Sequence, residues 1–247
     1  MTPPPGWRLR VEESLPSTSD LLLRLAAAGE PEGLAVLAHR QTAGRGREGR
    51  GWQSPPGNLY LSLLLRPDAP ARDAPVWALL AAVALAEALE ADLPSDAALR
   101  LKWPNDVLLR GRKLAGVLCE SAAREDGRVD WLVIGFGANL AVAPVLPDRP
   151  TACLAEITSP PAPEDLACRI LRSMEAWRAR LRASGPARLI AAWQSRGPEP
   201  DAPLTLRTGA GETTGRYRGL DRDGALLLET EGRVRRFATG ELSAGGS

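Results

Sequence analysis

The stretch Gly44-Arg45-Gly46-Arg47-Glu48-Gly49 decides between two classes of fold for this chain of 247 residues. Its spacing matches G-x-G-x-x-G, the dinucleotide-binding fingerprint, in which a strand precedes the glycines and a helix opens at the last one. An apolar strand-like segment, 34–38, does precede it, but Arg-Gly-Trp-Gln-Ser-Pro-Pro-Gly follows at 50–57. Glycine and proline at this density do not begin a helix. We therefore exclude a dinucleotide-binding fold and interpret residues 39–57 as a long irregular loop.

This loop is rich in arginine. Between Arg40 and Arg50 it holds four arginines and one acid, Glu48. Guanidinium groups suit phosphate and carboxylate oxygens, and interleaved glycines let the backbone approach a ligand and move. The pattern is typical of a loop that closes over an anionic substrate. A solvated loop that binds RNA has the same composition, so this segment alone leaves both alternatives open.

Strand and helix patterns alternate on both sides of the loop. A strand at 7–12 and a helix that begins at Ser17 and ends at Gly29 come before it, with capping residues at both helix ends. The following elements are expected after it: a strand at 59–65 with one apolar face, a helix at 73–91, strands at 99–103, 107–109, 114–120 and 129–137, and helices at 163–181 and 187–194. This order predicts an α+β domain with a mixed central sheet and flanking helices.

The last part of the chain differs in character. A proline-rich segment, 196–203, has the composition of a linker. Four short strands are expected after it, at 204–208, 213–220, 225–229 and 234–238, and their spacing with intervening turns suggests a small all-β barrel. We expect a larger domain over residues 1–197 and a small β-barrel domain over 198–247.

The net charge and the length of the apolar runs argue against a dedicated nucleic-acid binder and against a membrane protein. Lysine and arginine total 31, aspartate and glutamate total 30, and the net charge is +1. A dedicated nucleic-acid binder or a polybasic membrane anchor usually has a basic surplus. The longest uncharged apolar run, 76–86, has 11 residues, whereas about 20 are needed to cross a bilayer. We therefore expect no membrane insertion.

The cysteines indicate a reducing compartment. Residues 1–6 lack the basic and apolar regions of a secretory signal. Cys119, Cys153 and Cys168 are odd in number and far apart, and no pair has the C-x₂₋₄-C spacing of structural zinc sites. We expect reduced thiols in a cytoplasmic protein.

Two further segments could carry chemistry. Lys102-Trp103-Pro104-Asn105-Asp106 ends an apolar strand with a cation, a rigid turn, an amide and a carboxylate. A carboxylate beside phosphates would hold Mg²⁺, although a surface turn with an accidental Lys–Asp pair has the same sequence. Gly135-Phe136-Gly137-Ala138-Asn139 ends another strand with small residues and one amide. This suits a ring pressed against backbone, and it equally suits an ordinary strand exit.

Taken together and in this order, the motifs closely resemble those of the biotin–protein ligase family. The resemblance rests on Ser17-Thr18, Gln41 to Arg47, Trp52, Pro55, Gly57-Asn58-Leu59-Tyr60, Lys102 to Asp106, Arg112-Lys113-Leu114-Ala115-Gly116-Val117-Leu118 and Gly135 to Asn139. Residues 219–228 and 240–241 resemble the C-terminal barrel of that family. Two positions depart from the pattern: Ser19 stands where the family often has asparagine, and Glu48 where it often has a basic residue.

The resemblance implies a fold and an activity. The fold is a catalytic domain like that of class II aminoacyl-tRNA synthetases, followed by a Src-homology-3-like barrel. The activity is the conversion of biotin and MgATP to biotinyl-5′-AMP and pyrophosphate, followed by transfer of biotin to a lysine of a biotin carboxyl carrier protein. Only about 16 residues precede Ser17, so we expect the short form without the DNA-binding domain that some members carry.

The resemblance also assigns roles to residues. Lys113, Arg45 and Arg47 are the expected catalytic residues. The expected biotin-binding residues are Ser17, Thr18, Ser19, Gln41, Arg45, Gly46, Arg47, Lys113 and Gly116. The expected ATP-binding residues are Trp52, Lys102, Asn105 and Asn139, with Asp106 on Mg²⁺. Because the nucleophile of the first step is already a carboxylate, no general base is needed, and His39 is interpreted as an ordinary strand-end residue.

Two other functions remain open at this point. Lipoate–protein ligation is a related acyl-adenylate chemistry on the same type of fold. An RNA-binding module would use the arginine loop and the small barrel, although the near-zero net charge argues against it. The expected partners are biotin, ATP and a carrier domain, with no DNA and no membrane. The family includes monomers and dimers, so the sequence does not decide whether a homodimer forms.

Overall fold

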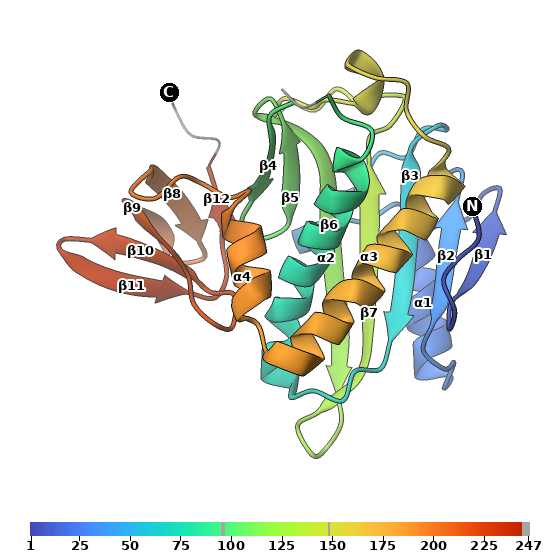
Figure 1. Ribbon diagram of the computed structural model, residues 1–247, viewed down its shortest axis with the longest axis horizontal. Helices are drawn as coiled ribbons and strands as arrows, with labels where there is room; N and C mark the ends of the chain where they lie inside the picture. The colour runs from blue at the N-terminus through green and yellow to red at the C-terminus, as the bar shows by residue number, and fades with distance from the viewer. Residues whose placement is uncertain (95–96, 148, 244–247) are drawn as a thin grey trace.

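Seven strands form the larger of two sheets in the computed structural model, which describes residues 1–94, 97–147 and 149–243 (Figure 1). In spatial order they are β1 (Arg8–Glu12), β2 (Leu34–Ala38), β3 (Leu59–Leu65), β7 (Val129–Ala138), β6 (Arg112–Ala123), β5 (Asp106–Leu109) and β4 (Leu99–Lys102). Only β1 and β2 are parallel to each other, and all other neighbours are antiparallel. The sheet is therefore mixed, and the expected α+β class is confirmed.

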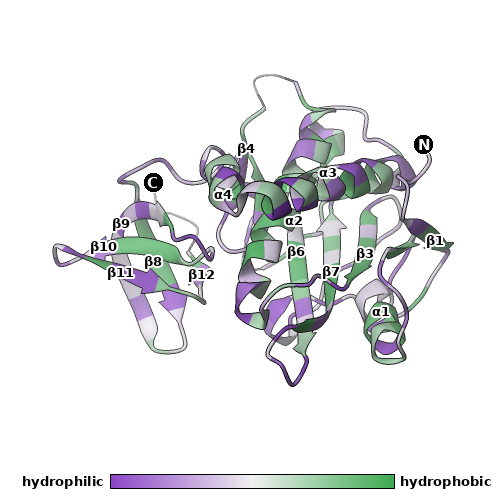
Figure 2. Ribbon diagram, turned by 60° about the horizontal axis from the view of Figure 1, so that its bottom comes forward, coloured by the Kyte–Doolittle hydropathy of each residue, from purple (hydrophilic) through white to green (hydrophobic). Residues whose placement is uncertain are grey.

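Helices cover both faces of this sheet. The helices of the described residues are α1 (Thr18–Ala27), α2 (Ala74–Glu90), α3 (Pro163–Ser184) and α4 (Ala187–Gln194), with short 3₁₀ turns at Arg47–Gly49, Ala71–Asp73 and Leu154–Glu156. Of these, α4 packs against α2, α3 and strand β9 (Gly211–Leu220) of the smaller sheet. Figures 1 and 2 show α2 and α3 side by side on one face and α1 alone on the other. One helix cannot cover a face of seven strands, and the part of this face beside α1 carries the pocket described below. No helix in the described ranges is long and apolar enough to span a membrane.

The start of α1 is fixed by its own sequence. Ser17 is the N-cap, and its Oγ accepts a hydrogen bond from the N–H of Asp20 at 3.3 Å. Gly29 follows the helix with φ +89°, a conformation that glycine adopts without strain. Because Ser17, Thr18 and Ser19 are all buried, the N-terminus of the helix places three hydroxyl groups against the sheet.

Strand β3 is buried more completely than its alternation predicts. Leu61 and Leu63 belong to the main core, which includes α2 and α3, whereas Leu64 packs in a second cluster under α1. Tyr60 and Ser62, which alternate with the leucines of the predicted apolar face, are also buried. The predicted apolar face of Leu59, Leu61, Leu63 and Leu65 is confirmed, since all four belong to the main core. The other face is buried as well, because α1 packs on it.

The C-terminal part forms a second, antiparallel sheet. Its strands, in spatial order, are β11 (Arg233–Phe237), β10 (Leu226–Thr230), β9 (Gly211–Leu220), β8 (Pro203–Thr208) and β12 (Glu241–Leu242). The four expected strands are present, and β12 is additional. This sheet packs against the larger part, since the indole Nε1 of Trp103 donates to the carbonyl of Gly224 at 3.0 Å and Leu226 belongs to the main core.

Candidate active site

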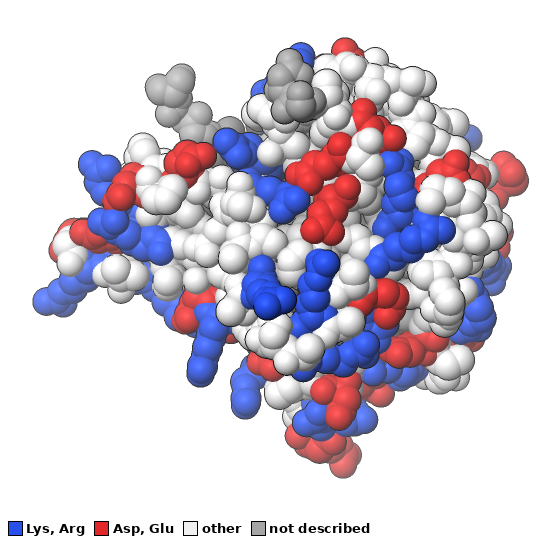
Figure 3. Space-filling model, viewed as in Figure 1, with Lys and Arg blue, Asp and Glu red and all other residues white. Residues whose placement is uncertain are grey.

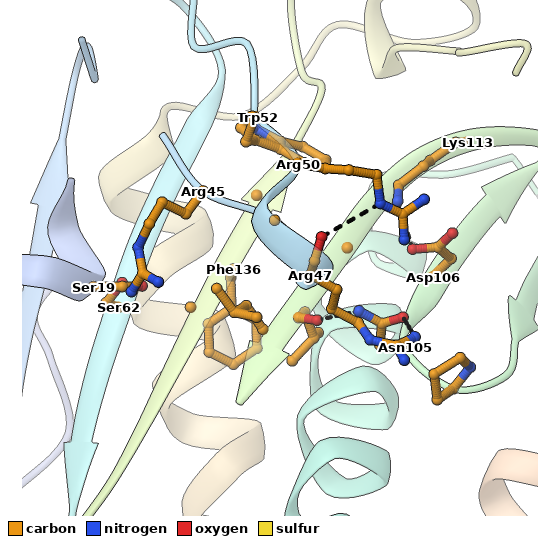
Figure 4. Close-up of a pocket in the computed structure, with 18 of the residues that line it drawn as sticks. Ser19, Arg45, Arg47, Arg50, Trp52, Ser62, Asn105, Asp106, Lys113 and Phe136 are labelled. Carbon is orange, nitrogen blue, oxygen red and sulfur yellow. Dashed lines mark hydrogen bonds and ion pairs between the residues drawn. The ribbon is translucent and has the colours of Figure 1, made fainter. Parts of the chain in front are cut away.

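A cavity of about 320 Å³ lies beside the N-terminus of α1, over strands β3, β6 and β7. The arginine loop and the turn between β4 and β5 both contribute residues to its lining (Figure 4). All the predicted site residues except Asn139 line it: Ser17, Thr18, Ser19, Gln41, Arg45, Gly46, Arg47, Trp52, Lys102, Asn105, Asp106, Lys113 and Gly116. Segments far apart in the sequence thus meet in one cavity.

One end of the cavity is a network of neutral hydroxyl groups. The Oγ of Ser62 lies 2.7 Å from Thr18 Oγ1 and 2.9 Å from Ser19 Oγ. Gln41 Oε1 accepts from the backbone N–H of Thr18 at 2.8 Å. Gly135 makes room for this network, because a Cβ there would lie 2.7 Å from Ser19 Oγ. This end can donate to and accept from a neutral polar ligand without a net charge.

Ser62 was not predicted from the sequence, although it leaves a signal there. It is the one serine in the leucine-rich strand 59–65, and it is completely buried. A buried hydroxyl needs hydrogen-bond partners, and those partners are the side chains of Thr18 and Ser19.

The opposite end of the cavity carries an ion pair. Lys113 Nζ lies 2.6 Å from Asp106 Oδ1, with side chains 16% and 10% exposed. Gly116 leaves space for the pair, since a Cβ there would lie 3.4 Å from Asp106 Oδ1 and 3.5 Å from Lys113 Nζ. The ring of Trp52 lies beside the ammonium group, 5.5 Å from Nζ to the ring centroid. A primary ammonium is therefore fixed at the end of the cavity away from the hydroxyl network (Figure 4).

Ion pairs hold the arginine loop over the cavity. Arg45 bridges Asp20 and Glu120, each at 2.7 Å. Arg47 donates to the carbonyl of Gly240 at 3.3 Å, and Arg50 pairs with Glu241 at 3.0 Å. The C-terminal sheet therefore contributes two contacts to a loop of the larger part.

Cationic and acidic groups meet where the C-terminal sheet reaches the cavity. Glu241 pairs with Arg50 and, at 3.3 Å, with Arg149. Burial opposes ionisation of Glu241, but the hydrogen bond and charge of Arg50 outweigh it and hold the pKa of this carboxyl below its usual value. Burial lowers the pKa of Lys102, although the negative charges of Asp106 and Glu241 nearby act to raise it. Sequence reasoning did not assign Glu241 or Arg149 to the site, because they approach it only through the tertiary fold.

Both parts of the chain are similar to known protein families. Residues 11–139 match the biotin/lipoate A/B protein ligase family, and residues 203–245 match the biotin protein ligase C-terminal domain. The chain belongs to the biotin/lipoate A/B protein ligase family.

Relatives and solved structures agree with this membership. The ligase is 40% identical over 199 residues to a biotin–[acetyl-CoA-carboxylase] ligase of Paracoccus denitrificans, covering 78% of this chain and 82% of that one. It is 36% identical to the bifunctional ligase/repressor BirA of Bacillus subtilis, covering 97% of this chain and 75% of that one. The structure of the Aquifex aeolicus biotin protein ligase in complex with biotin and ATP superposes with a TM-score of 0.79 at 29% identity, covering 96% and 97% of the two chains.

Asn139 lies outside the cavity lining of this ligase. Its Nδ2 donates to the carbonyl of Ala152 at 3.0 Å, and its side chain is almost fully buried. Its Oδ1 is buried and has no hydrogen-bond partner among the described residues. The amide therefore anchors a neighbouring segment through its nitrogen and leaves one acceptor unused.

The acidic residues near the cavity offer few ligands for a metal. No group of three or more histidine, cysteine, aspartate or glutamate side chains that could hold a metal ion occurs in the described ranges. Magnesium often takes only one or two protein carboxylates and completes its shell with water and substrate phosphates. Asp106 fits that requirement as a single carboxylate, although in this structure it pairs with Lys113.

Proposed function

We propose that this chain is an ATP-dependent biotin–protein ligase, which forms biotinyl-5′-AMP and pyrophosphate and then transfers biotin to a lysine of a biotin carboxyl carrier domain. The observation that carries the proposal is the polarity of the cavity. Neutral hydroxyl groups at one end suit a ureido ring, and a fixed ammonium at the other suits a carboxylate meeting a phosphate. Family membership and the relatives' names support the same reaction.

The neutral end holds the biotin ring in this proposal. Ser17, Thr18, Ser19 and Gln41 supply hydrogen bonds to the ureido group, and Ser62 joins them through its contacts with Thr18 and Ser19. Hydrogen bonds inside a cavity discriminate strongly, because a ligand that lacks the matching group leaves buried polar atoms unpaired. The biotin carboxylate then extends past Gly46 and Arg47 towards Lys113 and Gly116.

The reacting centre lies at Lys113. The biotin carboxylate attacks the α-phosphorus of ATP, and pyrophosphate leaves. Two anions approach each other, so a preorganised positive charge lowers the barrier. Lys113 supplies this charge to the carboxylate and α-phosphate oxygens, and Asp106 fixes its orientation through their ion pair. Mg²⁺, held by Asp106 and the phosphates, would neutralise charge on the triphosphate.

The adenosine and the remaining phosphates occupy the side of the cavity near Trp52. The indole ring packs directly on Gly137 and offers a flat surface for adenine. Asn139 remains a proposed ATP-binding residue, but its unused Oδ1 is buried outside the cavity lining, so a contact with an amino group of the base requires a local movement that exposes it. Lys102 and Asn105 lie beside the phosphates; the lowered pKa of Lys102 reflects a buried amine for which an anion would be a favourable neighbour.

The second step needs protection of the mixed anhydride from water. Arg45 and Arg47 are proposed to clamp the adenylate while the loop covers it, which excludes solvent. The acceptor lysine then attacks the carbonyl carbon, and AMP leaves. Surface ion pairs are weak, so the contacts of the loop with Asp20, Glu120 and Glu241 are compatible with opening and closing.

Ligand is expected to protect the loop from proteolysis. Residues from about Arg45 to Trp52 consist mainly of glycine and arginine, which do not form a core of their own, so local opening is cheap without ligand. Limited trypsin digestion should cleave this loop in the free protein and more slowly with biotinyl-5′-AMP bound. Sites in the β9–β10 region, such as Arg222, serve as the internal control. Equal cleavage of the loop with and without ligand would contradict the proposed closure.

We also propose a fold type for each of the two domains, a cellular location and a set of partners. We propose that the larger part is a class II aminoacyl-tRNA synthetase-like catalytic domain, residues 1–197, and that 198–247 is a Src-homology-3-like domain. The three cysteines are free thiols, which supports a cytoplasmic location. We propose that the protein binds neither DNA nor a membrane. A measurement of the molecular mass in solution distinguishes a monomer from a homodimer.

An assay of transfer separates the proposal from its alternatives. Purified protein, ATP, Mg²⁺ and a biotin carboxyl carrier domain should yield a carrier heavier by one biotinyl group, and lipoate in place of biotin should yield no addition. The RNA-binding alternative is disfavoured because Arg45 and Arg50 of the loop are paired with carboxylates and the net charge is only +1. Acidic and basic side chains also intermingle on the face that carries α2, α3 and α4 (Figure 3). Lipoylation of a carrier, or tight RNA binding without any ligation, would overturn the proposal.

A further inference from the structure

Asn58 makes an unusual set of hydrogen bonds just before β3. Its side chain is completely buried. Oδ1 accepts from three successive backbone N–H groups, those of Leu140, Ala141 and Val142, at 2.9, 3.0 and 3.1 Å. Nδ2 donates to the carbonyl of Val142 at 2.8 Å. One amide thus satisfies four backbone groups where the chain leaves β7.

The chain that leaves β7 returns to Lys113. The N–H of Lys113 donates to the carbonyl of Pro150, and the N–H of Ala152 donates to the carbonyl of Lys113, both at 2.9 Å. The described residues 140–147 and 149–152, together called segment 140–152, are therefore anchored at the near end by Asn58 and at the far end by the backbone of Lys113. Between these anchors, Leu146 and Arg149 line the cavity.

The position of these lining residues links them to one end of the cavity. Arg149 reaches Glu241 at 3.3 Å, in the cluster that also holds Lys102. Asn139, with its unused Oδ1, immediately precedes the segment. In the described part of the chain, the side chains of Thr18, Ser19 and Ser62 form hydrogen bonds with one another and with Gln41, at the other end of the cavity.

We propose that Asn58 is a positioning residue for nucleotide binding, which holds segment 140–152 in place so that Leu146 and Arg149 face the nucleotide. This inference rests on the proposed function, since it takes ATP as the ligand of that end. An amide suits the task because it accepts and donates at once. Gly57 helps, as its φ is +90° and a Cβ there would lie 3.0 Å from Ala141 Cβ. The two chain segments therefore approach closely at this point.

Replacing Asn58 separates the two substrates kinetically. In biotin-dependent ATP–pyrophosphate exchange, Asn58→Ala is expected to raise KM for ATP about tenfold or more and to leave KM for biotin within about twofold. Asn58→Asp keeps the acceptor oxygens and loses the donor, so its KM for ATP should lie between those of the wild type and Asn58→Ala. Leu189→Ala, in the buried face of α4, is the control for destabilisation alone and should change neither KM.

The outcomes distinguish this inference from the function on which it rests. Equal rises in both KM values, or no change in either, would overturn the positioning role while wild-type exchange upholds the function. If Asn58→Ala does not fold, Asn58→Asp decides, because an unchanged KM for ATP in that variant together with lost thermal stability means a purely structural role. Absence of biotin-dependent exchange in the wild type would overturn the function itself.

Discussion

Lys113→Arg is expected to slow adenylate formation by ~10²-fold or more, the range seen when one preorganised donor is lost from a reacting centre. Lysine is a compact point charge, whereas arginine is a wide planar fork, so equal charge does not give equal geometry. The space around Nζ is restricted: Asp106 Oδ1 lies 2.6 Å away, and a Cβ on Gly116 would already lie 3.5 Å from Nζ. A guanidinium cannot take the same position without moving these neighbours.

Single-turnover formation of biotinyl-5′-AMP measures this effect without interference from the transfer step. The matched control is Arg110→Lys, a change between the same two residue types in the exposed turn before β6, which should leave the rate unchanged. Far-ultraviolet circular dichroism and the melting temperature should show that Lys113→Arg remains folded. A near-normal rate of adenylate formation would place Lys113 outside the reacting centre.

Alanine at either of two glycines on β7 should weaken the binding of one substrate, and the substrate affected should differ between the two positions. A Cβ on Gly135 would lie 2.7 Å from Ser19 Oγ, in the hydroxyl network, whereas one on Gly137 would lie 2.5 Å from the ring of Trp52. Overpacking of this kind costs about 1–3 kcal/mol, roughly 5- to 150-fold in binding. Gly135→Ala should therefore raise KM for biotin, and Gly137→Ala should raise KM for ATP.

Exchange kinetics with each substrate varied in turn tests this pair. Gly209→Ala is the control, since nothing lies within 4 Å of a Cβ at that position, and neither KM should change. Opposite selectivity, with Gly135→Ala acting on ATP and Gly137→Ala acting on biotin, would reverse the orientation of the substrates in the cavity.

The bounds of a helix or strand were predicted correctly where the sequence signals lie within or directly beside that element. The strand at 34–38 and the helix at 187–194 have the predicted bounds, because apolar runs and flanking glycine or proline define them within the segment. The irregular loop at 39–57 likewise contains only one short 3₁₀ turn, at Arg47–Gly49. The strand β12 was not predicted, since Glu241–Leu242 is too short for any periodic pattern and exists only by pairing with β8.

The residues of the cavity were predicted from a set of motifs that occur in a fixed order along the chain. The contacts among these residues depend on the tertiary structure and could not be predicted in this way. Lys113 and Asp106 are seven residues apart in sequence, and their pairing depends on the antiparallel β5–β6 register. Ser62, Glu241 and Asn58 act through partners from 43 to 191 residues away. No local pattern encodes such distances, so the hydroxyl network, the contact with the C-terminal sheet and the anchor of segment 140–152 became visible only in three dimensions.

Isotope exchange between pyrophosphate and ATP, measured with biotin, with lipoate and with neither, shows whether this protein forms biotinyl-5′-AMP. This exchange reports reversible adenylate formation and needs no carrier protein. We expect rapid exchange with biotin, background exchange with lipoate or without an acid, and loss of the biotin-dependent signal in Lys113→Arg. Exchange that lipoate supports as well as biotin does, or the absence of exchange with biotin, would contradict the proposed function.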